Sequence, residues 1–158
     1  MLSIKAIFKL SFIPLLPLLA AGCDTLFDKG DTEKVFEGEV LEFFPLNAET
    51  IEGAGPVNIA VQLIGAQKES DLSVRFGVDA ENTTAVEGVH YTIETLSPVT
   101  LAANSSSADV TINVLGNSLE AGESAILVLV LQGAPEQGVE AAEELRTHNL
   151  IIVAEEDR

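Results

Sequence analysis

A regular alternation of apolar and polar residues recurs along the middle of this chain. From Val57 to Leu63 every second residue is apolar, and the same pattern returns over 72–78 and 110–114. Successive side chains of a β-strand point to opposite faces, so a period of two predicts strands with one buried face. A surface helix would instead repeat its apolar residues every three to four positions.

Further short apolar runs lie between clusters of turn-forming residues. They cover 35–44, 90–94, 99–102, 125–132 and 149–154. Short strands at this spacing predict an all-β fold, an immunoglobulin-like antiparallel β-sandwich of about seven strands.

Two segments depart from this pattern. The first strand changes its apolar phase near Glu39, where we expect a bulge or a switch between sheets. Residues Pro135–Arg146 are expected to form a long loop with at most one helical turn, because Gly138 weakens an already short helical pattern.

Composition excludes several classes of function. The 158 residues include 8 Lys and Arg against 25 Asp and Glu, a formal net charge of -17. Nucleic-acid binding requires clustered cations, so no nucleic acid is expected as a partner. With one cysteine and no tryptophan, neither a disulfide framework nor a cysteine-rich zinc site can form within the chain.

The N-terminus has the features of an export signal. Lys5 and Lys9 precede an apolar segment that is too short to span a bilayer comfortably, and no acidic residue occurs before Asp24. Residues 19–23, Leu-Ala-Ala-Gly-Cys, resemble the lipobox of bacterial lipoproteins. The alternative is an ordinary secretory signal followed by a coincidental cysteine.

The lipobox resemblance implies three parts. Residues 1–22 are the signal peptide, 23–34 the lipidated cysteine and a tether, and 35–158 the sandwich. Lipid, palmitate included, on Cys23 would anchor the protein in the bacterial cell envelope, in the outer membrane, on its periplasmic or its surface face. Cleavage takes two lysines and no acid from a chain of net charge -17, leaving -19. Such a charge repels anionic surfaces, so attachment must come from acyl chains.

A family resemblance appears at residues 83–92, Thr-Thr-Ala-Val-Glu-Gly-Val-His-Tyr-Thr. This stretch resembles the T-A-x-x-G-x-D-Y signature of Calx-beta domains, and the turn 120–123 matches the family's E-x-x-E. It is more similar still to a domain of unknown function common in Bacteroidetes-type lipoproteins. The resemblance implies an immunoglobulin-like sandwich, with Gly88 in a tight turn and the ring of Tyr91 packed inward.

The same resemblance implies a set of candidate calcium ligands. They are Glu52, Glu120, Glu123, Glu155 and Asp157. The family aspartate before the tyrosine is His90 here, and the acidic run before the E-x-x-E turn is 115–117, Leu-Gly-Asn. Calcium requires six to eight oxygen ligands, several of them carboxylates. We therefore expect no cofactor and interpret the acids as solvated turn residues, with a calcium-binding module as the alternative.

Catalysis has little support in the sequence. Cys23 would be lipidated, and neither His90 nor His148 lies in a recognisable catalytic motif. We expect a non-enzymatic protein.

Two predicted strands, 126–131 and 150–153, do not alternate. Matching the E-x-x-E turn to the family places Leu127 and Leu129 inside the sandwich. The predicted outer face then carries Ile126, Val128, Val130, Leu150 and Ile152. Either the chain covers this face itself, with the first strand or with 135–146, or the face contacts a partner.

These observations favour a lipid-anchored binding or assembly module of the envelope. The favoured partner is another envelope protein. A glycan is the alternative ligand, although aromatic residues are only 5% of the chain and tryptophan is absent.

Overall fold

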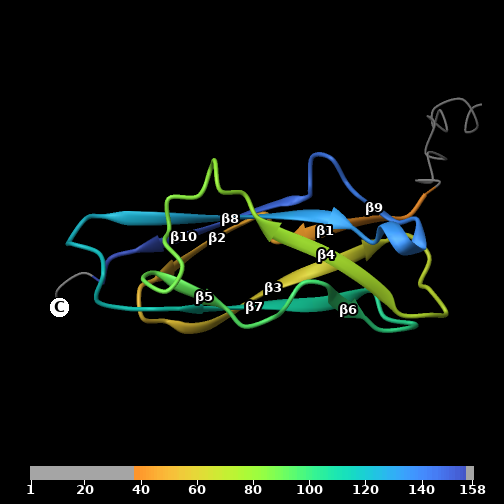
Figure 1. The fold of residues 1–158 in the computed structure, drawn as a ribbon, viewed down its shortest axis with the longest axis horizontal. Coiled ribbons are helices and arrows are strands. Elements are labelled where there is room, and N and C mark those ends of the chain that lie inside the picture. Colours follow the sequence, from red (N-terminus) through yellow and green to blue (C-terminus); the bar gives the residue numbers. More distant parts are fainter. Residues whose placement is uncertain (1–37, 156–158) are drawn as a thin grey trace, which may run out of the picture. The chain divides into compact units, whose positions relative to one another are not determined.

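The structure, a computed structural model, describes residues 38–155, and these form an all-β sandwich (Figure 1). Cys23 and Asp157, which the sequence predicts as the lipidation site and a candidate calcium ligand, lie outside the described residues. The strands are β1 (Val40–Phe44), β2 (Asn47–Ile51), β3 (Gly55–Ile64), β4 (Leu72–Val78), β5 (Tyr91–Ile93), β6 (Val99–Leu101), β7 (Ser107–Val114), β8 (Ser124–Gly133), β9 (Glu140–Ala141) and β10 (Thr147–Val153). The predicted immunoglobulin-like sandwich is confirmed, with β2 and β9 as strands that the sequence pattern did not predict.

The strands form two five-stranded sheets. Sheet I has the order β5-β7-β3-β1-β9 and sheet II the order β2-β10-β8-β4-β6. Figure 1 shows β8 and β10 in one layer and β3 and β7 in the other. Neighbouring strands are antiparallel except for β1 with β9 and β2 with β10, which are parallel.

The alternating residues fill the space between the sheets. Ile59 and Val61 of β3 and Leu72 and Val74 of β4 are all buried in one continuous core. The predicted period of two is therefore the period of burial in these strands. Each such aliphatic side chain stabilises the fold by about 1.5–3 kcal/mol when it is fully buried.

The first strand changes sheets, but not near Glu39 as expected. The chain leaves sheet I after Phe44 and enters sheet II at Asn47. Pro45 lies at this crossing and offers no N–H to either ladder, so it suits a point where pairing with one sheet ends. Because of the crossing, β2 becomes the edge strand of sheet II.

The segment after β8 contains a short 3-10 helix, η1 (Pro135–Gln137), as the expected single helical turn. It then forms β9 beside β1, and Val139 is buried in the core. Gly133 makes this close approach possible. Its φ is 83°, and a Cβ there would lie 2.7 Å from the Val139 carbonyl oxygen.

Between residues 38 and 155 there is no helix of sufficient length and hydropathy to cross a membrane.

Candidate functional site

The outer faces of the two sheets differ in character. Residues of sheet I that alternate with the core are mostly polar: Glu42, Asn58, Gln62, Ser107, Asp109, Thr111 and Asn113. Asn58 accepts a hydrogen bond from the Thr111 hydroxyl at 2.9 Å. The large apolar residues of this face are Phe44, which is 58% exposed, and the half-buried pair Val40 and Ile64. Such a face is what an antiparallel sheet presents to water.

The outer face of sheet II is apolar at its centre. Leu127, Leu129 and Leu131 of β8 are buried in the core, so the intervening residues point outward. The outward placement of Ile126, Val128 and Val130 is as predicted.

The placement predicted for the last strand is wrong. Leu150 and Ile152 are fully buried and belong to the core between the sheets. β10 pairs antiparallel with β8, and Leu150 lies opposite Leu127, so the two side chains share the inner face. The residues that point outward are instead Ile151 and Val153. A shift of one residue exchanges the two faces of a strand.

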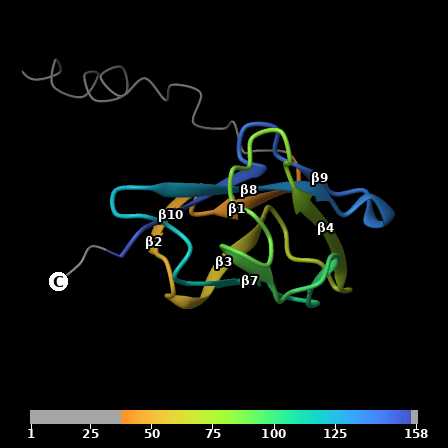
Figure 2. The ribbon, with the colours of Figure 1, turned by 60° about the vertical axis from the view of Figure 1, so that its left-hand side comes forward.

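Val128 is covered by the chain itself. Although it points outward, it is only 4% exposed. The segment that follows β4 runs along β8 at this position, and Figures 1 and 2 show it rising beside β8 on the side away from β3 and β7. The Thr83 hydroxyl accepts a hydrogen bond from the Val128 N–H at 3.0 Å, and the Thr84 hydroxyl accepts one from the Ile126 N–H at 2.9 Å.

Neither of the two covers expected from the sequence lies over Val128. The first strand extends sheet II at its edge as β2, and the 135–146 segment pairs with β1. The Leu145 carbonyl accepts a hydrogen bond from the Phe43 N–H, which ties this segment to sheet I.

Four aliphatic residues on the outer face of sheet II form a continuous apolar strip. Ile51 on β2 pairs with Val153 on β10, and Ile151, two residues before Val153, pairs with Ile126 on β8. Ile51 is 51% exposed and the other three are half-buried. We call these four residues the apolar strip.

A hollow of about 660 Å³ adjoins the apolar strip at the ends of β2 and β10. Ile51 and Val153 line it together with three acidic residues, Glu49, Glu123 and Glu155. Among residues 38–155, no lysine, arginine or histidine lines it. The hollow thus combines aliphatic surface with negative charge.

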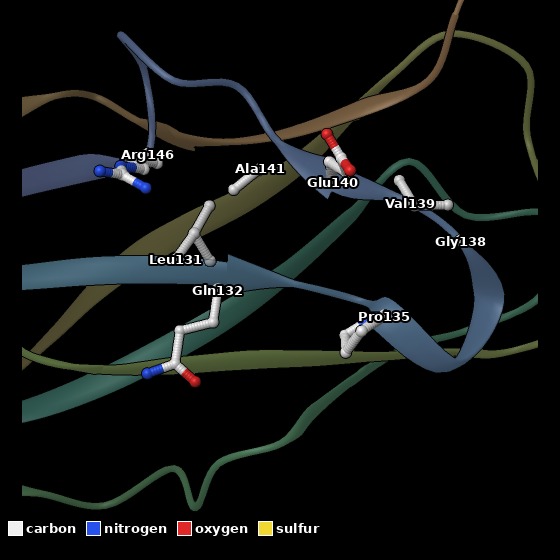
Figure 3. A pocket seen from close by; sticks show the side chains of 8 residues that line it. All are labelled: Leu131, Gln132, Pro135, Gly138, Val139, Glu140, Ala141 and Arg146. Atoms are coloured by element: carbon white, nitrogen blue, oxygen red, sulfur yellow. The ribbon is translucent and has the colours of Figure 1, made fainter.

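A second cavity, of about 410 Å³, lies between β8 and β9 (Figure 3). Arg146 and Glu140 lie on different sides of it, and Leu131 and Gln132 line it from β8. Lys68 pairs with Glu39 and Arg75 with Glu136, which leaves Arg146 as the cation of residues 38–155 without a salt bridge. The polar groups of this cavity do not converge on one point, so we do not consider it the site.

The candidate calcium ligands serve the turns in which they lie. One carboxylate oxygen of Glu52 accepts hydrogen bonds from the N–H groups of Ser118 at 2.9 Å and Leu119 at 3.2 Å. These bonds, that from Ser118 first, lower the pKa of Glu52. Glu123 accepts a bond from the Glu120 N–H at 3.0 Å, and Glu155 is exposed at the end of β10.

The candidate ligands within residues 38–155 do not converge on a calcium site. Among residues 38–155 no three acidic, histidine or cysteine side chains gather at one point. Calcium coordination needs several carboxylates turned toward a common centre. Here Glu52 and Glu123 turn instead toward backbone donors.

The Calx-beta-like signature forms a turn before β5. Gly88 has φ of 79° and donates a hydrogen bond to the Tyr91 carbonyl at 2.8 Å. Tyr91 is buried, as the resemblance implied, and burial, with the charge of Glu87 second, raises its pKa. His90 accepts a hydrogen bond from the Val86 N–H on Nδ1 at 2.7 Å. The Nδ1 of His90 is therefore a hydrogen-bond acceptor in this turn, a role that an aspartate carboxylate could also fill.

Comparison with known proteins gives the fold a name. No protein-family model and no curated protein matches the chain. Among solved structures, the apo form of the Calx CBD1 domain is similar with a TM-score of 0.62 and 17% identity, over 76% of this chain and 100% of that domain. The fold is Calx-beta-like.

Two further solved structures have a similar fold over part of their own, longer chains. The calcium binding domain CBD12 of CALX1.1 has a TM-score of 0.60 and 16% identity, over 73% of this chain and 44% of that one. EndoBT-3987 of Bacteroides thetaiotamicron, solved with its Man5GlcNAc product, has a TM-score of 0.56 and 12% identity, over 72% of this chain and 30% of that one. Structural similarity at such low sequence identity establishes the sandwich fold and does not identify a ligand.

Proposed function

We propose that this protein is a lipid-anchored, non-catalytic binding or assembly module of the bacterial cell envelope that docks another envelope protein. The observation that carries the proposal is the difference between its outer faces. Sheet I is mostly polar, whereas sheet II presents the apolar strip beside an open hollow.

Contact between the apolar strip and water is unfavourable, so covering the strip would be favourable. Removing apolar area from water contributes roughly 25 cal/mol per Å² toward a complex, against which the entropic cost of association counts. Exposed aliphatic side chains grouped on one sheet face are typical of a protein-binding surface, whereas single exposed ones are common on any protein. Exposed Ile51 and the half-buried Ile126, Ile151 and Val153 form such a group, which is partly accessible to a partner.

The anchor is proposed from the sequence. Cys23 would hold the acyl chains, and residues 24–34 would separate the sandwich from the membrane. One acyl chain gives only reversible binding, and more than one is needed for stable anchoring. The outer membrane is the proposed location.

The absence of catalysis is likewise proposed from chemistry. Neither histidine of the chain is placed as an accessible base beside a nucleophile: His148 is fully buried and the Nδ1 of His90 is occupied by the Val86 N–H. The pKa of Glu52 is lowered by its turn, which makes it a poorer base.

A glycan-binding lipoprotein is the second candidate, and Phe44 is the observation that favours it. This exposed ring lies on the polar face of sheet I, near Gln62 and Asn58, and sugar sites combine an aromatic face with polar groups. Phe44 lines neither of the two cavities described above, whereas the apolar strip adjoins one of them. We therefore favour the protein partner.

Native electrophoresis of detergent-extracted membranes tests the proposal. The wild type is expected to migrate as a complex larger than the mature chain. Ile151→Lys should migrate as the free protein, while Gln62→Lys, on the outer face of sheet I, should keep the complex. A wild type that migrates as the free protein, or equal effects of the two variants, would contradict a partner on sheet II.

A further inference from the structure

The free edge of β2 adjoins both the apolar strip and the acidic hollow. Among the strands of residues 38–155, β2 is the terminal strand of sheet II, and Asn47, Glu49 and Ile51 are its exposed residues. Unpaired strand edges present a row of backbone N–H and C=O groups to any chain that can pair with them. This edge is five residues long, whereas the edge strands β5, β6 and β9 have two or three residues.

The hydrogen-bond pattern shows which groups of β2 are free. The Asn149 N–H donates to the Leu46 carbonyl, and the Glu52 N–H donates to the Val153 carbonyl. In a parallel pair alternate residues bond to one neighbour, so Leu46, Ala48, Thr50 and Glu52 face β10. The backbone groups of Asn47 and Glu49, and the N–H of Ile51, therefore point to the open edge.

The side chains at this edge define what could pair with it. Glu49 and Ile51 point to the outer face, in register with Ile151 and Val153 of β10. A strand added beside β2 would place every second side chain against this face. A cation beside Glu49 and an aliphatic residue beside Ile51 would complement it. Glu49 has no hydrogen bond or salt bridge with another side chain of residues 38–155 that would already compensate its charge.

A second copy of this chain does not complement the edge. In a two-fold antiparallel pairing about the centre of β2, the two Glu49 side chains would lie opposite each other, and like charges directly opposite destabilise a sheet. Each copy also carries a net charge of -17 before processing. The hollow, lined by Glu49, Glu123 and Glu155, adds a negative charge that a basic segment would neutralise.

We propose that β2 is extended by a strand from another envelope protein, which bears a Lys or Arg next to aliphatic residues. The main chain of the partner pairs with Asn47, Glu49 and Ile51. Its cation lies beside Glu49 in the hollow, and its aliphatic side chains cover Ile51 and Val153. This inference rests on the proposed function and names the chemistry of the partner.

Photo-crosslinking in intact cells tests the strand directly. A photoreactive amino acid replaces Asn47 in the full-length, lipidated protein, and the crosslinked peptide of the partner is sequenced. The expected adduct is one extended segment of a second envelope protein, with Lys or Arg within two residues of an aliphatic residue. In the same strain Glu49→Lys should lower the yield about tenfold or more and Glu49→Gln by less, while Glu42→Lys on sheet I leaves it unchanged.

Three results would overturn the proposal. They are an adduct with a second copy of this chain, an adduct with lipid or glycan, and a crosslinked segment whose yield is insensitive to Glu49→Lys. The absence of any adduct at position 47 also overturns strand addition. In that case the electrophoresis of Ile151→Lys decides separately whether sheet II still docks a partner, so the two proposals can fail independently.

Discussion

The Nδ1 of His148 donates a hydrogen bond to the carbonyl oxygen of Pro45 across 2.5 Å, which ties β10 to the point where the first strand changes sheets. Since the carbonyl can only accept, Nδ1 carries the proton. The other ring nitrogen, Nε2, lies in the core without a partner, and the ring of Phe43 meets the imidazole edge-on at 6.0 Å. The folded protein therefore holds a neutral histidine in apolar surroundings.

This histidine makes stability depend on pH. Burial lowers the pKa of His148 below its ordinary value near 6.5, and the bond to Pro45 opposes the shift only in part. Between the lowered pKa and about 6.5 the unfolded chain binds a proton that the folded chain does not. Unfolding free energy should therefore fall as pH is lowered through about 6.5, by at most about 1.4 kcal/mol per pH unit, and level off below the folded pKa. Urea titrations from pH 5 to 8 measure this pH dependence of the unfolding free energy.

A matched pair of variants isolates the group. His148→Gln keeps a side-chain N–H for the Pro45 carbonyl and does not titrate, so the slope should disappear. His90→Asn, at the other histidine, should retain it. A slope that persists in His148→Gln would mean that other groups cause it.

The turn before β5 depends on an acceptor at His90. His90→Ala leaves the Val86 N–H without its bond and should cost about 1 kcal/mol, the typical net worth of one hydrogen bond. His90→Asp restores an acceptor and should recover most of this loss. Thermal unfolding of the three proteins at pH 8 gives the comparison. Equal losses in both variants would show that imidazole packing, rather than the hydrogen bond, holds the turn.

The outer face of sheet II contains the covered residue Val128 and the partly accessible residues of the apolar strip, among them Ile151. Val128→Lys forces a charge beneath the 79–85 segment and should cost at least about 2 kcal/mol of unfolding free energy in the purified sandwich. Ile151 is half-buried, and a lysine side chain at this position can extend to solvent, so Ile151→Lys should change the unfolding free energy by no more than about 0.5 kcal/mol. Urea unfolding of both variants checks the pair, and similar losses would indicate that the face is covered throughout.

The carboxylate of Glu52 is expected to hold its turn rather than a metal. Glu52→Gln should speed amide exchange at Ser118 and Leu119, because the neutral amide is a weaker acceptor. Since the pKa is lowered on folding, the stabilisation by Glu52 is present above its unfolded pKa and is lost as pH falls through the folded one.

Millimolar Ca²⁺ should barely move the melting temperature of the wild type. Calcium at 100 times its dissociation constant would add about 2.7 kcal/mol, a shift of several degrees for a domain of this size. A shift of that size that Glu52→Gln abolishes would restore the calcium-binding alternative.

The lipid anchor is tested by fractionation. Cys23→Ser should accumulate unprocessed or leave the membrane fraction, since the acyl chains have no other thiol to join. Wild-type amounts of processed Cys23→Ser in washed membranes would contradict the anchor. Asp24→Asn, next to the cysteine, serves as the control for changes in the tether itself.

Sequence alone predicts the sandwich because burial and alternation coincide in most strands. β4 was predicted with its observed ends, and β3, β7 and β8 within a few residues. The sequence pattern does not predict β2, because its core-facing residues Ala48 and Thr50 give almost no apolar period. β9 is a two-residue contact that depends on the approach of β1.

The faces of β10 could not be read from hydropathy. Leu150 to Val153 are all apolar, so either phase is compatible with burial. The polar residue Asn149, outward and in phase with Ile151 and Val153, was the available signal. His148 obscured it, because a fully buried histidine occupies an inner position where alternation predicts an apolar residue. The hollow and the free edge of β2 follow from the sheet order, which no local pattern encodes.

Thiol accessibility in native membranes tests most directly whether sheet II is covered by a partner. The only natural cysteine, Cys23, would be acylated, so an introduced cysteine is the single reactive thiol. Ile51→Cys lies in the apolar strip and Asn58→Cys on the outer face of sheet I, and both positions are exposed in the sandwich. We expect maleimide to label Ile51→Cys at least about tenfold more slowly in membranes than in the purified, lipid-free protein, and to label Asn58→Cys equally in both. Equal labelling of Ile51→Cys in the two preparations would contradict a partner on sheet II.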